Sequence, residues 1–486
     1  MPQNDYNQLI EKFQQFRKKL YNCFVCGHDS VLDLLDALSS NQSARSIAEL
    51  CLNPLFRRHY SALYKAIGQC LSSTRCEETS LLRQQQQQSL LEAVAQLIPS
   101  PKQRDFFLFG LDITPVPRPY AKTLEDRSYI HQPNTIKGNK PINIGHPYSL
   151  LSVLPERMET SDVPWSIPLS GQRVISNQKG IEVGTEQINF VIESPSSPWN
   201  GHLCVVAADS EYSSRSFLRE QVKQQNLVVI TRVRSNRVFY SQPTTQDFFA
   251  SHRGHPKWYG ERFDLKDDAT WREADETVQT NLTNRRGRLL SLTVKAWHQM
   301  LMRGTKDNPM HLHPFNLLQI LVTDSEGKQL FSPMWLIVIG QRRQELTAMC
   351  SYQAYRQRFD MEHMLRFGKQ RLLMGAFQTP EVEHEENWIQ LTLLAYAQLW
   401  AARKLAVHLP RPWERYLTRN LNPTITPSMV QRSFLRIITQ IGTPAISPKP
   451  RGFSTGRVPG QSLGKRQRQS VLKKGKKSQS SPQKTA

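Results

Sequence analysis

The chain has 486 residues, which at roughly 150 residues per domain suggests about three folded units. Its 63 Lys and Arg exceed its 41 Asp and Glu, and the resulting net charge of +22 predicts a polyanionic partner. The 7 cysteines are too few for a disulfide scaffold and indicate a reducing compartment. Because the N-terminus is polar, we expect no secretory signal. No apolar run approaches the ~18 residues of a membrane span, so we expect no membrane insertion.

The first part of the chain, residues 1–100, is predicted to be an all-helical region. Apolar residues recur at three- and four-residue spacing, most clearly in the run from Val31 to Leu38. Strand patterns are nearly absent from this stretch, so we expect the sheet to begin later in the chain.

Two short helices are expected in the middle of this region. Ser43 is a suitable cap for the first, and Pro54 is expected to open the second, which carries Arg57 and Arg58. This outline is similar to a helix-turn-helix, so both arginines are candidate DNA contacts. The alternative is that they only form a solvated helix face, which is the commoner case.

Residues 101–235 change to short apolar runs separated by helical patterns. We expect strands in DFFLFGLDITPV, GHPYSLLSVL and HLCVVAADS, and a helix in IEVGTEQINFVIE. A further helix from Ser213 to Gln225 and a strand, LVVITRVR, follow; Arg232 and Arg234 on that strand are further candidate DNA contacts. Alternating strands and helices predict the first part of an α/β core.

Residues 236–330 interrupt this rhythm with proline, glycine and charge, followed by alternating apolar segments, and are predicted to be a β-rich insertion. Aromatic side chains in such an insertion could stack on a base of a remodelled DNA strand, although core or surface packing is the commoner role. The candidates are Trp258, Trp271 and Trp297.

Residues 331–443 are expected to resume the core with the strand MWLIVIG, a long helix beginning near Ser351 and further C-terminal helices. Residues 444–486 contain 11 Lys or Arg and no acid. Their composition predicts a disordered basic tail, because too little apolar area is available to order it.

Two acids stand where an apolar strand pattern ends, Asp112 and Asp209. If the two strands are neighbours in one sheet, both carboxylates converge at the edge where α/β sheets place their ligands. The alternative for either acid alone is a cap of a turn or of the following helix.

A third acid, Glu362, lies in a helical stretch with Tyr355, Arg358, Arg366 and Lys369 at offsets of about three and four residues. These five residues share one helix face. An acid flanked by cations is either an ion-paired surface stripe or a metal ligand beside a phosphate-binding row, and the spacing does not decide between them.

Four of these residues reproduce the Y-x2-R-x3-E-x6-K signature of bacterial insertion-sequence transposases of the DDE type, namely Tyr355, Arg358, Glu362 and Lys369. The chain resembles this family from about residue 10 to about residue 460. The resemblance implies an RNase H-like catalytic core, interrupted by a β-strand insertion between the second and third acids.

The resemblance also implies the roles of the site residues. Asp112, Asp209 and Glu362 would be the catalytic acids and metal ligands, and Tyr355, Arg358 and Lys369 would bind DNA phosphates near the cut. Phosphodiester transfer without a covalent enzyme intermediate uses two Mg²⁺ about 4 Å apart, for which Mn²⁺ can substitute. Three carboxylates are enough to hold both ions, because Mg²⁺ keeps several of its waters.

The expected function is therefore cut-and-paste transposition: cleavage of double-stranded DNA at the ends of an insertion sequence and joining to target DNA. The family implies a homodimer at the paired ends, in a bacterial cytoplasm at the nucleoid. Two alternatives stay open, a metal-dependent nuclease of the same fold that does not join strands, and a catalytically inactive DNA-binding protein derived from a transposase.

Overall fold

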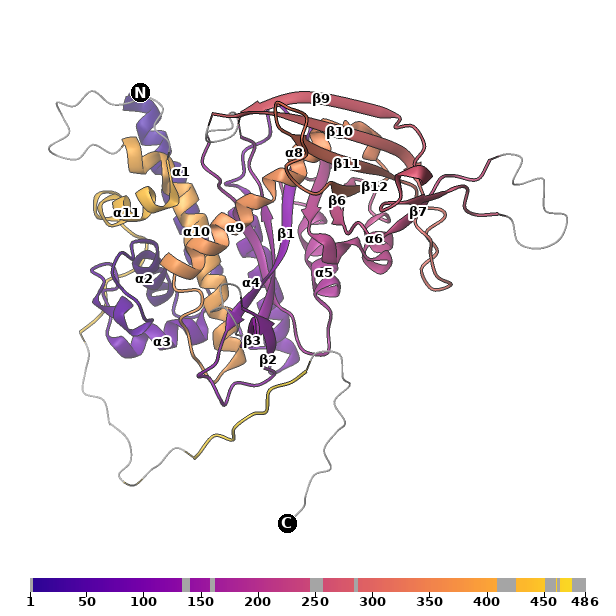
Figure 1. Cartoon of the computed structure of the whole chain (residues 1–486). Coiled ribbons are helices and arrows are strands. Elements are labelled where there is room, and N and C mark those ends of the chain that lie inside the picture. The colour runs from indigo at the N-terminus through magenta and orange to yellow at the C-terminus, as the bar shows by residue number, and fades with distance from the viewer. Residues whose placement is uncertain are drawn as a thin grey trace, which may run out of the picture.

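The computed structural model describes residues 3–132, 140–157, 162–244, 257–283, 287–408, 425–450, 460 and 464–473 (Figure 1). Its first part is helical, as predicted, and consists of α1 (Gln3–Cys23), α2 (His28–Ser39), the 3-10 helix η1 (Ala48–Leu52), α3 (Tyr60–Gln69) and α4 (Glu77–Ala95). The prediction that a helix opens at Pro54 is wrong, since α3 begins six residues later. Asn53 accepts a hydrogen bond from the Leu55 amide at 3.0 Å, which closes a turn over the proline before the helix starts.

The rest of the chain supplies a mixed α/β body. The helices are α5 (Gly180–Ile192), α6 (Arg215–Gln221), α8 (Ala348–Gln357), α9 (Phe359–Arg371), α10 (Val382–His408) and α11 (Pro427–Ile441), and the strands are β1 (Phe106–Pro117), β2 (Ser128–His131), β3 (Ile142–Val153), β4 (Ile167–Arg173), β5 (Leu203–Ala208), β6 (Leu227–Val233), β7 (Val238–Tyr240), β8 (Arg262–Asp264), β9 (Glu276–Thr283), β10 (Leu289–Met300), β11 (Phe315–Thr323) and β12 (Met334–Gly340).

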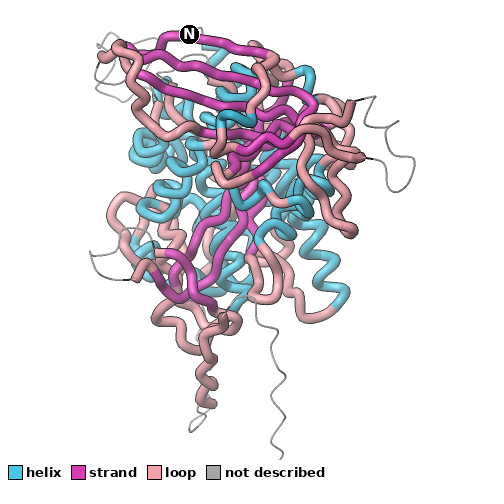
Figure 2. The backbone as a smooth tube through the Cα atoms, turned by 45° about the vertical axis from the view of Figure 1, so that its right-hand side comes forward, coloured by secondary structure: helices cyan, strands magenta, loops and turns pink. Residues whose placement is uncertain are grey.

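Ten strands of the described ranges form one sheet in the order β2-β3-β1-β5-β6-β12-β11-β10-β9, with β4 paired to β3 off this path (Figure 2). β1, β5 and β6 run parallel to one another, while β3 and β12 flank them antiparallel. The five central strands are buried and rich in Val, Ile and Leu, as expected where helices cover both faces.

Residues 236–330 are β-rich, as predicted, but three of their strands extend the main sheet. These are β9, β10 and β11: β9 pairs with β10, β10 with β11, and β11 with β12, which follows this segment and pairs with β6, all antiparallel. The chain thus leaves the sheet after β6 and returns to its free edge. Only β7 and β8 form a separate two-stranded sheet among the described residues.

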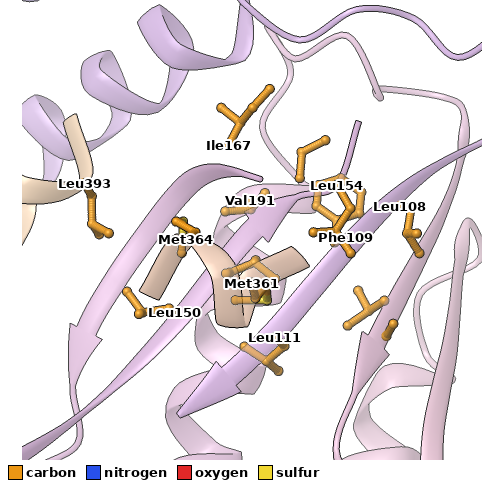
Figure 3. Close-up of a cluster of buried hydrophobic side chains, with 14 of the residues drawn as sticks. Leu108, Phe109, Leu111, Leu150, Leu154, Ile167, Val191, Met361, Met364 and Leu393 are labelled. Carbon is orange, nitrogen blue, oxygen red and sulfur yellow. The ribbon is translucent and has the colours of Figure 1, made fainter. Parts of the chain in front are cut away.

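The two faces of β1 are covered by different helices (Figure 3). A Cβ at Gly110 would collide with Met361 of α9, whereas the next residue, Leu111, lies against Gly184 of α5. Successive residues of a strand point to opposite faces, so α9 and α5 lie on opposite sides of the sheet. Met361 and Met364 of α9 are fully buried.

The single long helix expected from Ser351 is in fact two helices, α8 and α9, which meet at Arg358. The Arg358 amide donates to Tyr355 and the Met361 amide donates to Arg358, both across three residues, so the backbone tightens at this point. The helix expected from Ser213 to Gln225 is also shorter: Ser214 caps the start of α6 through the Phe217 amide, and the chain turns after Gln221 through hydrogen bonds across three residues.

Part of the predicted tail contacts the folded body. Residues 464–473 run below β2 and β3 as the yellow stretch in Figure 1, and Leu472 forms a β-bridge with Ser128. Residues 451–459 and 474–486 lie outside the described residues, so the prediction of disorder there stays a prediction. Within the part of the chain that is described, no helix has the length and hydropathy needed to cross a membrane.

Candidate active site

Asp112 and Asp209 lie side by side at one edge of the sheet. β1 and β5 are parallel neighbours, and Leu111 is the register partner of Ala208, so the two acids follow the last paired residues of adjacent strands. Asp209 also accepts a hydrogen bond from the Glu211 amide at 2.9 Å, which caps the 3-10 helix η2 (Ser210–Ser213). Asp209 therefore does both things considered above: it caps the following helix, and it lies beside Asp112.

Arg358 joins the first acid to the third. Its Nη1 lies 3.3 Å from Asp112 Oδ2, and its Nη2 lies 3.8 Å from Glu362 Oε1 one helical turn further on. The tightened backbone between α8 and α9 directs this side chain, of which only 10% is exposed, toward the sheet edge. Asp112 points to the same face as Gly110, two residues earlier on β1, and α9 covers that face.

The carboxyl group of Asp112 is in an environment that disfavours its charge. Burial raises its pKa to about 6; the positive charge of Arg358 opposes this shift, and the negative charges of Asp209 and Glu362 add to it. Three carboxylates thus share one neighbourhood with a single paired guanidinium. A raised pKa from burial and like charges is typical of a functional site.

The other residues of the signature surround this guanidinium. The Tyr355 ring centre lies 5.9 Å from the Arg358 guanidinium carbon, and only 4% of Tyr355 is exposed. Lys369, half-buried on α9, feels the charge of Asp112, which opposes the lowering of its pKa by burial. Tyr355 therefore holds Arg358 in place, and Lys369 adds a second cation near the acids.

The arginines of β6 lie next to this site. Thr231 is the register partner of Ala208, so Arg232 stands beside Asp209, and its charge acts on the Tyr355 hydroxyl. Arg232 and Arg234 are both exposed. Their position keeps them as candidate DNA contacts.

Arg57 and Arg58 have partners inside the protein. Both pair with the buried Asp33 of α2, at 2.7 and 3.0 Å, and they donate to the main-chain carbonyls of Ala445 and Ile446. These contacts fasten the chain after α11 to the N-terminal helices. If Arg57 and Arg58 contact DNA, they must do so while they keep these structural contacts.

A cleft of about 1340 Å³ opens at the edge that carries the two adjacent acids. Asp112, Asp209, Glu211 and Tyr212 lie along it, and residues of β2, β4 and the start of α5 form other parts of its lining. The sequence reasoning did not single out Glu211 and Tyr212; the signal present was the DSEY stretch that directly follows a predicted buried strand.

The donor set fits a hard divalent cation, because carboxylate oxygens are the ligands that Mg²⁺ prefers. Among the described residues, however, no three Asp, Glu, His or Cys side chains stand in an arrangement that could hold a metal ion. Arg358 lies between Asp112 and Glu362 and supplies the positive charge there. Loading a cation on all three acids would require this guanidinium to move.

Of the three candidate base-stacking tryptophans, two are structural. Trp297 is 2% exposed, and Trp271 packs edge-to-face on it with ring centres 6.2 Å apart. Trp258 is 41% exposed and stacks on His311 with ring centres 4.3 Å apart. Trp258 is therefore the most exposed of the three, Trp271 being partly buried and Trp297 buried.

A comparison with known families agrees with this geometry. A family model described as DDE superfamily endonuclease matches residues 19–304, more than half of the chain. The match includes Asp112 and Asp209 and stops before the helices with the signature. No curated protein matches the sequence of the chain. The chain thus belongs to the DDE superfamily endonucleases, a family that acts on DNA.

Proposed function

We propose that this protein is a DDE transposase that cleaves DNA at the ends of an insertion sequence and joins them to target DNA. The observation that carries the proposal is the position of Asp112 and Asp209 on adjacent strands, directly after the last pair between β1 and β5. The contacts of Arg358 with Asp112 and Glu362 bring the signature helices to these acids. The family match supports the endonuclease part of the proposal, and the four-residue signature supports the transposase part.

The sheet supports an RNase H-like core. β1 has the antiparallel β3 on one side and the parallel β5 and β6 on the other, with the acids at the carboxyl ends of β5 and within β1. The later strands β9–β12 continue the same sheet, which accommodates the long segment between the second and third acids without a separate domain.

Asp112, Asp209 and Glu362 would hold two Mg²⁺ ions, or Mn²⁺ in their place. When bound, such ions supply an activated water or 3′-hydroxyl and charge stabilisation of the leaving oxygen. The burial that raises the pKa of Asp112 also strengthens the electrostatic interactions of any charge placed beside it.

Arg358, Lys369 and Arg232 would bind phosphates of the substrate strand. Arg358 offers a planar fork that suits a phosphate as well as a carboxylate, so it can exchange Asp112 for the DNA backbone. Tyr355 orients this fork by packing against it. A homodimer on paired DNA ends, in a bacterial cytoplasm, would complete the reaction.

Incubation of the purified protein with a DNA duplex from the flanks of its gene, a supercoiled target plasmid and Mg²⁺ tests the proposal. Joined products are expected, with a short single-stranded gap on each side of the inserted DNA where the two target strands are cut at staggered positions. Nicked DNA without joined products would favour a nuclease that does not transfer strands. Binding without any metal-dependent cut would favour an inactive, transposase-derived DNA-binding protein.

A further inference from the structure

Residues 464–473, here called the C-terminal strap, lie on the body through specific contacts at both ends. The Arg466 guanidinium pairs with Glu381 at 2.7 Å. Further on, the Gln469 amide donates to Lys122 at 3.1 Å, and the Leu472 amide donates to Arg127 at 2.8 Å. Three separate contacts and a β-bridge distinguish the strap from a freely solvated tail.

A buried arginine of the folded body, Arg127, forms part of the surface that binds the strap. Arg127 is 3% exposed and pairs with no carboxylate in the described part of the chain. Its guanidinium donates instead to main-chain carbonyls, which belong to Leu124, Arg118, Lys122 and, from the strap, Gln469 at 3.4 Å. A guanidinium buried without an acid is costly unless its donors are satisfied, so the strap carbonyl completes the set.

The end of the strap forms part of the cleft that holds the candidate catalytic acids. Val471, Leu472 and Lys473 line this cleft together with Asp112 and Asp209. About 1340 Å³ of open space remains with the strap in place, more than the roughly 300–1,000 Å³ of small-molecule sites. The strap is therefore a wall of the cleft and does not fill it.

Few cations of this cleft are available to a ligand. Arg173 is committed to Asp126 at 2.5 Å and to Glu386 at 3.0 Å. Lys179 and Lys473 line the cleft, are exposed, and make no ion pair with the residues that the structure describes. The strap thus contributes one of two uncommitted lysines facing a space that ends at the acids.

We propose that the C-terminal strap is a wall of the DNA-binding cleft and that Lys473 contacts the phosphate backbone of the strand that leads to the acids. The identity of the ligand as DNA rests on the proposed function. The placement of the charges determines where phosphate binds in the cleft. Acids at the reacting end repel phosphate unless they hold cations, while lysines along the cleft attract it.

Charge reversal in the full-length chain tests the position of this contact. Lys473→Glu and the matched control Arg468→Glu change the same charge on the same strap, but only the first residue lines the cleft. Binding of a fluorescein-labelled DNA duplex is measured by anisotropy in EDTA at several salt concentrations. We expect Lys473→Glu to weaken binding at least tenfold and Arg468→Glu less than threefold. Equal losses would overturn the proposal, because the strap would then act only as diffuse charge.

A disulfide lock tests the wall itself. Ser128→Cys combined with Leu472→Cys joins the strap to β2 at the observed bridge. The oxidised protein should bind the same duplex within twofold of its dithiothreitol-reduced form. Loss of binding on oxidation, restored by reduction, would show that the strap blocks the cleft and would overturn the proposal. Both tests are done without metal and measure only DNA binding. A protein that gives the expected binding results but cuts no DNA would refute the proposed function and leave the proposal about the strap intact.

Discussion

Arg358 lies against Asp112, with Nη1 of the arginine 3.3 Å from Oδ2 of the acid, and this pair is where the helix signature meets the sheet. The same guanidinium reaches Glu362 at 3.8 Å. One guanidinium therefore contacts two of the three candidate acids. Under the proposed function, binding of metal and binding of phosphate would be coupled through this side chain, because a cation on Asp112 would release the guanidinium for DNA.

The first prediction concerns the fork geometry of this arginine. Arg358→Ala should reduce cleavage by at least 100-fold, about 2.7 kcal/mol of barrier, while DNA affinity changes far less. Arg358→Lys should not restore full activity, because a bidentate contact with phosphate is lost. Arg356→Ala, on the exposed side of α8, is the control and should be active. A fully active Arg358→Lys would contradict the geometric role.

The second prediction uses the raised pKa of Asp112, about 6, which burial causes. In the unfolded chain the same group titrates near ~3.9, so between these values the folded state binds more protons. The contribution of Asp112 to the free energy of unfolding therefore falls as pH rises from about 4 to about 6. Asp112→Asn should gain about 1–3 kcal/mol relative to wild type between pH 4 and pH 7. Urea unfolding at both pH values measures this; a pH-independent difference would argue against the shift.

The third prediction concerns the contact between β1 and α9. Gly110→Ala places a methyl group against the buried Met361 side chain, so this side chain or α9 must shift, at a cost of about 1–3 kcal/mol. Because α9 carries Glu362, cleavage should fall more than stability alone explains. Gly375→Ala meets no atom within 4 Å and is the matched control. Thermal unfolding and cleavage rates are compared; equal behaviour of both variants would mean that α9 tolerates the extra methyl group.

The fourth prediction concerns a buried ionic cluster between the sheet and α10. Glu385 is fully buried and contacts His146 Nδ1 at 2.6 Å and Arg118 Nε at 3.2 Å. Glu385→Ala leaves Arg118 buried without a carboxylate and should cost about 3–5 kcal/mol. Glu220→Ala removes an exposed ion pair with Lys223 and should cost under about 1 kcal/mol. Urea unfolding distinguishes them; similar costs would refute the proposed importance of the buried cluster.

Local sequence patterns predicted the helical N-terminal region and the strand end at Asp209, whereas the strand of Asp112 continues past this acid to Pro117, because β3 pairs with it there. The features that were predicted depend on residues close together in the chain. The partners of Arg57 could not be predicted, since Asp33 and Ala445 reach it from 24 and 388 residues away. The return of β12 to β6 and the docking of the strap on Arg127 are likewise contacts between distant segments. The break at Arg358 depends on packing against the sheet, so helical periodicity did not indicate it.

The most direct test of the catalytic cluster compares the wild type with three single variants, Asp112→Asn, Asp209→Asn and Glu362→Gln. Each protein is incubated with Mg²⁺ and the flanking DNA of the gene, and the rate of strand cleavage is measured beside DNA affinity in EDTA. The account predicts that every variant binds DNA like the wild type and loses cleavage, with double variants no worse than single ones because the acids act as a unit. A variant that retains more than about a tenth of the wild-type rate, roughly 1.4 kcal/mol of barrier, would contradict the place of that acid in the site.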